Sequence, residues 1–414
     1  MVSLPCPIRL PSLQNEQVTK VGVKSPEDVV VVSAVRTAMA KGRKGGFKDT
    51  LADELLSGVL KATITRTGID PSLVQDIVVG NVAAKGGLAT PARMAALHAG
   101  FPESTSVSTC NRQCSSGLQA CVQIASAIQA GLIDVGIGAG VESMTSDYFS
   151  RDVKVSEKIA KENQPAADCK IPMGLTSEAV AKEYNISRHD QDAFSVESHK
   201  KAAAAQAAGY FKEEIVPLKV TVLDKNGENA KEVVIDQDEG IRANSSVESL
   251  GKLKPAFTAD GSTTAGNASQ ISDGAAAVLL MKRKVAQKLG LPILGKYVTA
   301  AAVGVPPKIM GVGPAYAIPV VVDRAGLKLE DIDIYEINEA FASQALYTVR
   351  VLGLDAAKVN KNGGAIALGH PLGCTGARQV ATLFPILKRE GKRLGVTSMC
   401  IGSGMGMAAL WESE

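Results

Sequence analysis

Several features that mark metal, redox or membrane proteins are missing from this 414-residue chain. Its seven cysteines include no CxxC pair and its four histidines show no HxxxH spacing, so the sequence predicts neither a metal site nor a disulfide framework. A reducing, intracellular setting fits this cysteine usage. The longest apolar runs, such as residues 275–281, fall far short of the roughly 18 residues that a membrane span needs. We therefore expect a soluble protein.

An excess of either charge is missing too. The chain has 45 Lys and Arg against 42 Asp and Glu, a net charge of +3, which is too balanced to favour nucleic acid or a membrane as the main partner. None of its Gly-rich runs reads GxGxxG or GxxxxGK[ST], so a dinucleotide or ATP enzyme is disfavoured. Glycine itself is abundant, with 40 residues, which suits backbones that turn tightly or approach a ligand closely.

A polar stretch around Cys114 is the first candidate for chemistry. Residues 108–119 read S-T-C-N-R-Q-C-S-S-G-L-Q, and apolar residues then recur every three to four positions, which predicts a helix that starts just after Cys114. A thiol at a helix N-terminus meets unpaired N–H groups and the positive end of the helix dipole, and both favour the nucleophilic thiolate. The alternative is an inert, buried cysteine.

The order of predicted elements indicates an α/β fold with a duplicated half. Strands and helices alternate in the first part of the chain, at residues 28–32, 50–67, 76–82, 90–99, 115–128 and 134–140. The C-terminal part repeats this order, because residues 329–338 echo residues 73–81 and are followed by a Gly-rich turn with a helix (363–387) and a strand region (394–410). Two such layers packed face to face would each bring a turn to a shared cleft. Chance likeness between two generic α/β patterns is the alternative.

Between the two halves the composition changes. Residues 145–254 are dense in charge and contain amphipathic helical stretches, which indicates an inserted lobe rather than more of the sheet. The predicted organisation is a leader (1–27), an N-terminal half (28–144 and 255–294), an inserted loop domain (145–254) and a C-terminal half (295–414).

Three further polar positions lie at the ends of predicted elements. Asn338 follows a strand, His370 lies in a Gly-rich turn before a helix, and Cys400 precedes a Gly-x-Gly-x-Gly run that begins at Gly402. A lone histidine is usually a satisfied core or surface residue. His370 differs, because glycines and a proline fix the backbone around it, and the glycines after Cys400 imply a backbone that something must approach closely.

Taken together, these motifs resemble the thiolase family over residues 29–412, in particular the 3-ketoacyl-CoA thiolases of peroxisomal fatty acid β-oxidation. N-R-Q-Cys114-S-S-G, Asn338-E-A-F, G-His370-P-L-G and Cys400-I-G-S-G-M-G follow one another in that family's order. The resemblance implies two αβαβα halves packed in layers, with a loop domain inserted in the first, which agrees with the repeat.

The resemblance also implies roles. Cys114 would be the nucleophile that carries the acyl group, His370 its base, and Cys400 the acid that moves the α-carbon proton. Asn338 would hold a water that stabilises the enolate oxygen. The backbone N–H groups of Cys114 and Gly402 would form a second oxyanion hole.

Two substrate contacts follow from the same resemblance. Ser269 matches a position near the pantetheine arm of CoA, and Met173 matches one that lines the acyl pocket. No cofactor is implied, because CoA is a substrate. Residues 172–174 read Pro-Met-Gly and lack the histidine that many short-chain biosynthetic thiolases carry there, which favours the degradative branch.

Other functions remain open at this point. An acetoacetyl-CoA thiolase that works in the condensation direction would use the same groups. A ketoacyl synthase is less favoured, because it would pair its cysteine with two His or with His and Lys, whereas the second partner here is Cys400. A non-catalytic lipid or CoA carrier is the alternative from another class, and such a protein should have lost Cys114, His370 or Cys400.

The resemblance finally suggests a location in the cell and an oligomeric state. Arg9-Leu10 begins a stretch like the family's N-terminal peroxisomal nonapeptide, with Gln17 one residue late and Val18 after it. We expect a peroxisomal enzyme, with the cytoplasm as the alternative. We also expect a homodimer, since closed symmetric dimers are the commonest soluble assembly.

Overall fold

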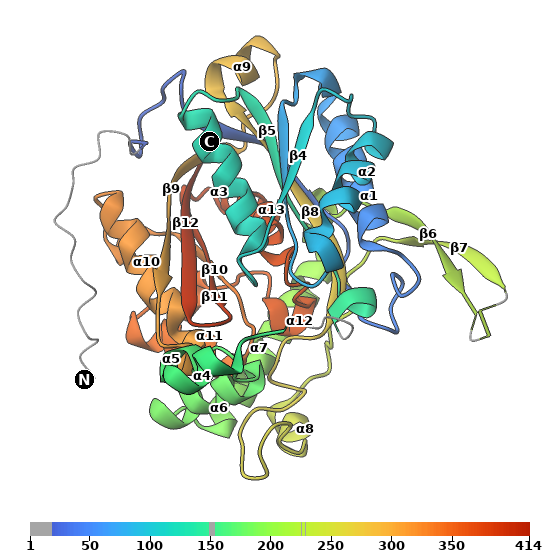
Figure 1. Cartoon of the computed structure of the whole chain (residues 1–414). Coiled ribbons are helices and arrows are strands. Elements are labelled where there is room, and N and C mark those ends of the chain that lie inside the picture. Colours follow the sequence, from blue (N-terminus) through green and yellow to red (C-terminus); the bar gives the residue numbers. More distant parts are fainter. Residues whose placement is uncertain (1–18, 149–153, 225, 228) are drawn as a thin grey trace.

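The computed structural model describes residues 19–148, 154–224, 226–227 and 229–414 (Figure 1). A ten-stranded sheet forms its centre, with the strand order β10-β11-β12-β9-β1-β8-β5-β3-β4 and with β2 paired to β8. The strands are β1 (Val29–Arg36), β2 (Ala40–Lys41), β3 (Asp76–Gly80), β4 (Ser106–Cys110), β5 (Val135–Ser143), β8 (Ser272–Lys282), β9 (Gly295–Gly304), β10 (Ile334–Ile337), β11 (Leu394–Ile401) and β12 (Met405–Ser413).

The sheet is internally symmetric, which is the structural form of the repeat seen in the sequence. The run β3-β5-β8-β1 pairs parallel, antiparallel and antiparallel, and the run β10-β11-β12-β9 pairs in the same senses. The halves join at β1 and β9, where Val30 pairs with Lys296 and Val31 with Gly295. The predicted α/β duplication is therefore confirmed.

Helices lie between and outside the two halves of the sheet. The helices α3 (Ser116–Gln129) and α13 (Thr375–Glu390) occupy the centre of the molecule, where they pack against each other and where α13 contacts strands of both halves (Figure 1). The layers therefore meet through helices rather than sheet on sheet, because strands such as β1 and β8 are apolar on both faces and need helices on each side. The outer helices are α1 (Ala52–Thr67), α2 (Ala89–Ala99), α10 (Gly313–Arg324) and α11 (Ala342–Val351).

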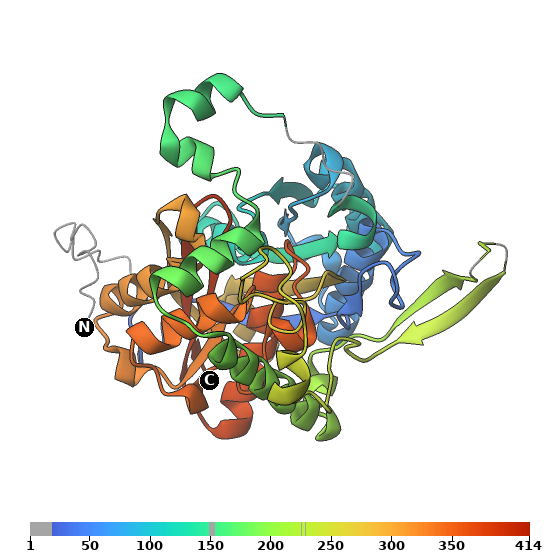
Figure 2. The same ribbon diagram turned by 90° about the horizontal axis from the view of Figure 1, so that it is seen from below.

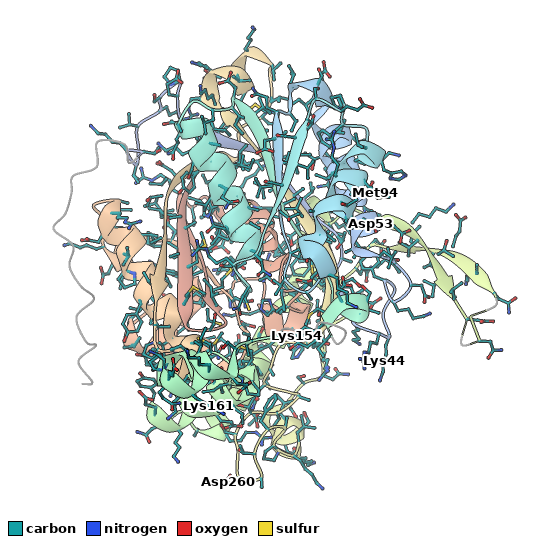
Figure 3. All side chains as sticks on the ribbon, viewed as in Figure 1. Lys44, Asp53, Met94, Lys154, Lys161 and Asp260 are labelled. Atoms are coloured by element: carbon teal, nitrogen blue, oxygen red, sulfur yellow. The ribbon has the colours of Figure 1, made fainter. Side chains whose placement is uncertain are left out.

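The segment between β5 and β8, which we call the lobe, includes residues 145–254, for which the sequence predicts an inserted domain. It holds the helices α4 (Glu157–Glu162), α5 (Gln164–Asp168), α6 (Met173–Glu183), α7 (Arg188–Ala207) and α8 (Val247–Gly251) and the paired strands β6 (Leu218–Leu223) and β7 (Ala230–Ile235). Viewed from below, the β6–β7 hairpin projects away from the body of the molecule (Figure 2). Charged side chains such as Lys161 and Asp260 lie on the lobe's outer surface (Figure 3). Within the described ranges, no helix is long and apolar enough to cross a lipid bilayer.

A buried ionic cluster attaches this lobe to the sheet. Arg36, at the end of β1, is fully buried; its Nε lies 2.7 Å from Glu214 Oε1 and its Nη1 lies 2.7 Å from Asp238 Oδ1. Both carboxylates belong to the lobe. Without the Arg36 guanidinium, their negative charges would be buried with no compensating positive charge. The cluster therefore couples the folding of the lobe to that of the sheet.

Replacing Arg36 by Met is expected to lower the free energy of unfolding by about 3–5 kcal/mol, because a buried ion pair loses one partner. Denaturant unfolding followed by circular dichroism measures the loss. Lys252→Met is the matched control, since the ion pair of Lys252 with Glu248 is largely exposed and such pairs contribute little. A loss at Arg36 no larger than that of the control would contradict the anchoring role.

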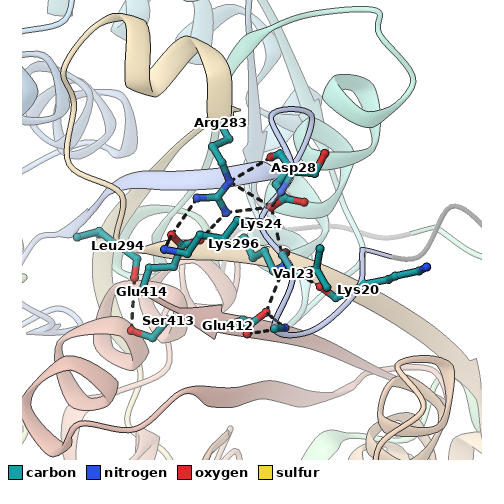
Figure 4. Close-up of polar contacts among 12 residues, drawn as sticks. Lys20, Val23, Lys24, Asp28, Arg283, Leu294, Lys296, Glu412, Ser413 and Glu414 are labelled. Atoms are coloured by element: carbon teal, nitrogen blue, oxygen red, sulfur yellow. Dashed lines mark hydrogen bonds and ion pairs between the residues drawn. The ribbon is translucent and has the colours of Figure 1, made fainter.

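A second ionic network closes the seam between the two halves (Figure 4). Arg283, which opens the helix α9 (Arg283–Lys288), donates from Nη2 to Asp28 Oδ2 at 2.9 Å and from Nη1 to Glu414 Oε2 at 2.8 Å. Lys296 Nζ lies 3.2 Å from Glu412 Oε2. The start of β1, the start of β9 and the end of β12 are thereby held together beside the β1–β9 junction.

Candidate active site

Cys114 lies where the sequence placed it, just before a buried helix. The turn from β4 into α3 is held by short hydrogen bonds, in which Ser116 Oγ donates to the Gln113 carbonyl at 2.6 Å and accepts from the Arg112 N–H at 3.0 Å. Gln113 has a φ of 46°, a left-handed conformation that turns the chain into the helix. Cys114 is 8% exposed, and the helix that the sequence predicts just after it begins at Ser116.

His370 lies in the turn between α12 (Ala365–Leu368) and α13 and is buried. Its Nδ1 is 2.6 Å from Thr375 Oγ1, and that hydroxyl lies 3.0 Å from the Pro371 carbonyl oxygen. Because a carbonyl can only accept, the hydroxyl donates to Pro371 and accepts from Nδ1–H, which leaves the lone pair on Nε2. Burial lowers the pKa of His370 to about 3, so the ring is neutral at physiological pH. Such a ring can accept a proton at Nε2.

Asn338 follows β10 and faces this histidine. Its Nδ2 lies 3.3 Å from His370 Nε2. Its Oδ1 is buried and has no hydrogen-bond partner among the residues that the structure describes. A buried amide oxygen of this kind is suited to an ordered water.

Cys400, near the end of β11, is almost fully buried. Its Sγ lies 3.3 Å from Gln344 Oε1. Burial raises the pKa of the Cys400 thiol above its ordinary value, and the neighbouring Cys114 raises it further. Cys400 therefore remains protonated at neutral pH.

Gly402 begins the tight turn between β11 and β12. A Cβ at this position would lie 1.9 Å from Gln113 Oε1, so the side-chain amide of Gln113 lies directly against the Gly402 backbone. Gln113 Nε2 also donates to Ser403 Oγ at 2.8 Å, across 290 residues of sequence. These contacts hold the Cys114 turn against the Gly402 turn, and each turn comes from a different half.

Ser269 and Met173 reach the same region from the lobe side. The Ser269 N–H donates to the Ala340 carbonyl at 3.0 Å, which ties it to the motif that follows Asn338. Met173 packs against a small apolar cluster that includes Cys400. The structure thus brings all seven predicted site residues to one region: Cys114, Met173, Ser269, Asn338, His370, Cys400 and Gly402.

The His370 turn is fixed to the other half by Glu142. This buried carboxylate, at the end of β5, accepts hydrogen bonds from the Gly373 N–H at 2.9 Å, from the Val82 and Ala83 N–H groups at 3.1 Å, and from Asn81 Nδ2 at 3.1 Å. A carboxylate can accept several such bonds at once. Glu142 therefore locks the backbone that carries His370 against the N-terminal half.

Sequence reasoning gave no role to several of these side chains. Thr375, Gln344 and Glu142 contact the predicted groups or their backbone, and neither Gln344 nor Glu142 lies in a local pattern that indicates chemistry. Thr375 alone carried a signal, because a hydroxyl five residues after a histidine at a helix start can reach its ring. The other two act across segments that are distant in sequence.

Comparisons with known proteins agree with this architecture. Residues 29–284 match the family model described as "Thiolase, N-terminal domain", and residues 291–413 match "Thiolase, C-terminal domain". The peroxisomal 3-ketoacyl-CoA thiolase of Yarrowia lipolytica is 57% identical over 391 residues, which cover 94% of each chain. The peroxisomal 3-ketoacyl CoA thiolase 1 of Petunia hybrida is 59% identical over 93% of this chain and 84% of its own.

Two solved structures extend the comparison. The dimeric peroxisomal thiolase of Saccharomyces cerevisiae superposes with a TM-score of 0.89 at 50% identity, covering 95% of this chain and 99% of that one. Human mitochondrial 3-ketoacyl-CoA thiolase in complex with CoA gives a TM-score of 0.83 at 35% identity, covering 94% and 98%.

Proposed function

The chain belongs to the thiolase family, and from that premise we propose that it is a 3-ketoacyl-CoA thiolase of fatty acid β-oxidation. As an acyltransferase, it cleaves a 3-ketoacyl-CoA with free CoA to acetyl-CoA and a shortened acyl-CoA. The observation that carries this proposal is that two buried thiols and a neutral imidazole, drawn from both halves, lie on segments that pack against one another. The names of its relatives, at 57–59% identity, support the substrate class.

In the proposed first half-reaction, His370 Nε2 takes the proton of the Cys114 thiol and the thiolate attacks the keto carbon. The carbon–carbon bond then breaks, which leaves an acyl thioester on Cys114 and the enolate of acetyl-CoA. The S–H bond of Cys400 breaks to protonate the α-carbon. Asn338, through a bound water, stabilises the enolate oxygen, and the N–H groups of Cys114 and Gly402 stabilise the other oxyanion.

In the second half-reaction, His370 first returns its proton to the Cys400 thiolate. It then deprotonates incoming CoA, whose sulfur attacks the acyl thioester. The Cys114 thiolate leaves and takes the proton back from His370, so all protons are accounted for and no cofactor takes part. Ser269 would contact the pantetheine arm and Met173 the acyl chain.

Thiolysis of 3-ketoacyl-CoA substrates of increasing chain length tests the proposal. Cleavage of medium or long chains supports the degradative activity, whereas activity on acetoacetyl-CoA alone would favour the biosynthetic alternative. A structure of the acetyl-CoA acetyltransferase of Bacillus anthracis is 39% identical to this chain, which is the reason to test that alternative. CoA binding without any cleavage would favour a carrier, although Cys114, His370 and Cys400 are all present.

The peroxisomal names of the relatives support a peroxisomal location. The candidate signal that begins at Arg9 and ends at Val18 lies outside the described residues. A fusion of residues 1–40 to a fluorescent protein is expected to give puncta that coincide with a peroxisomal marker. The same fusion with Arg9→Glu should be diffuse, and a diffuse signal from the unaltered fusion would remove the claim for this leader.

A homodimer is the expected assembly, because the similar yeast structure is described as dimeric. Sedimentation velocity at micromolar concentration should therefore give twice the chain mass of 43.0 kDa. A single species of one chain mass would contradict the expectation.

A further inference from the structure

Gln344 is a buried amide beside the Cys400 thiol that the proposed mechanism does not use. It lies in the first turn of α11, and its side chain is 2% exposed. Cys400 Sγ lies 3.3 Å from Gln344 Oε1, within the range of a sulfur hydrogen bond. The two residues come from separate elements, 56 positions apart.

The orientation of the amide follows from its other neighbour. Gln344 Nε2 lies 3.5 Å from Met310 Sδ, a thioether that accepts weakly and donates nothing. The N–H side of the amide therefore faces Met310, and the oxygen faces Cys400.

The space around the amide is also fixed. A Cβ built at Gly311 would lie 2.1 Å from Gln344 Cγ and 2.3 Å from its Cδ, so the side chain lies directly on the glycine backbone. This packing leaves the amide oxygen little freedom to move away from Cys400.

The Cys400 thiol can use the Gln344 oxygen as a hydrogen-bond acceptor. A buried thiol with a raised pKa remains S–H at neutral pH and can donate a hydrogen bond. An acceptor that holds the hydrogen also holds the sulfur in one rotamer. The hydrogen can then leave for the α-carbon by rotation about the Cβ–Sγ bond, without displacement of the sulfur.

We propose that Gln344 is a positioning residue for the α-proton step, with its amide oxygen holding the Cys400 thiol in place for proton transfer. The inference rests on the proposed thiolase function and deepens it. Acyl transfer from a saturated acyl-CoA to Cys114 moves no α-proton. That half of the reaction should therefore not depend on Gln344.

The test is Gln344→Met, which keeps the side-chain volume and removes the amide acceptor. Solvent deuterium exchange into the methyl group of acetyl-CoA, measured by NMR, is expected to fall by about tenfold or more, and thiolysis with it. Acylation of Cys114 by acetyl-CoA, measured by mass spectrometry, should stay within about threefold of wild type. Gln191→Met is the matched control, because Gln191 is another buried glutamine whose side chain donates to Ser262 Oγ and the Ile186 carbonyl, both in the lobe.

Gln344→Glu adds a pH readout that a packing role would not move. The neutral carboxyl keeps an acceptor oxygen, whereas the ionised form disfavours the Cys400 thiolate that must form during exchange. Exchange in this variant is therefore expected to fall as pH rises, relative to wild type.

Each outcome is decisive. An unchanged ratio of methyl exchange to acylation in folded Gln344→Met would overturn the inference, and so would an equal loss of both activities. A wild-type protein that neither acylates Cys114 nor cleaves any 3-ketoacyl-CoA would overturn the proposed function, and the inference with it.

Discussion

A Cys400→Ala variant should still acquire an acetyl group on Cys114 from acetyl-CoA, yet lose methyl-proton exchange and the cleavage of 3-ketoacyl-CoA. Acyl transfer needs a nucleophile, a base and an oxyanion hole, and Cys114, His370 and the Gly402 turn would supply them. Breaking the carbon–carbon bond also needs a proton at the α-carbon. With Cys400 absent, that proton has no carrier, and a loss of about 10²–10⁴-fold is expected.

His370→Ala distinguishes the proton-transfer role of Cys400 from a role in both halves of the reaction. His370 would serve the nucleophile in both halves of the reaction, so its removal should impair acylation and exchange together. Trapped acyl-enzyme by mass spectrometry and methyl exchange by NMR, on protein shown to be folded, measure the two halves independently. Exchange that persists at the wild-type rate in Cys400→Ala would show that another group carries the proton.

Cys114→Ser should abolish turnover, with a fall in kcat of at least about a thousandfold. The hydroxyl is far less ionised than a thiol at a helix N-terminus, so the attacking anion is almost absent. Steady-state thiolysis measures the loss, and mass spectrometry should find no acyl adduct at residue 114.

The matched control is Cys121→Ser, because Cys121 is a buried thiol of the helix that follows Cys114 and its Sγ hydrogen-bonds to the Gly138 carbonyl, at 3.6 Å, within the apolar core. Any cost of placing a hydroxyl in this core should show there as lost stability, while activity per folded molecule remains. Near-normal thiolysis by Cys114→Ser would refute the assignment of Cys114 as nucleophile.

The sequence predicted well those features that local pattern determines. The helix after Cys114, the buried strands and the repeat all follow from periodicity within short windows, and each is present in the structure. The turn that bears His370 and the turn that follows Cys400 could be predicted because glycine and proline limit the backbone there. The family's motif order then indicated that these turns meet.

Contacts between distant segments could not be predicted in the same way. Gln113 with Ser403, Arg36 with Asp238, and Cys400 with Gln344 join side chains from different elements, and no residue pattern on one side specifies the other. They depend on the packed geometry of the two halves. The side chains that hold the reactive groups in place therefore came only from the structure.

The position of Glu142 bears on how many acyl groups one chain can carry at a time. The last paired residues of β3 and β5 are Gly80 and Gly140, so Asn81 lies one residue and Glu142 two residues beyond them. Asn338 and Cys400 hold the same positions beyond the β10–β11 pair Ile337 and Ser398.

The two halves thus have equivalent positions beyond their strand ends, and different residues occupy them. At the position in the N-terminal half, the backbone N–H groups of Val82, Ala83 and Gly373 donate to the side chain of Glu142 itself. Glu142 therefore has a structural role, because from the N-terminal half it supports the turn that carries His370. The stoichiometry should therefore be one acyl group per chain, despite the symmetry of the scaffold.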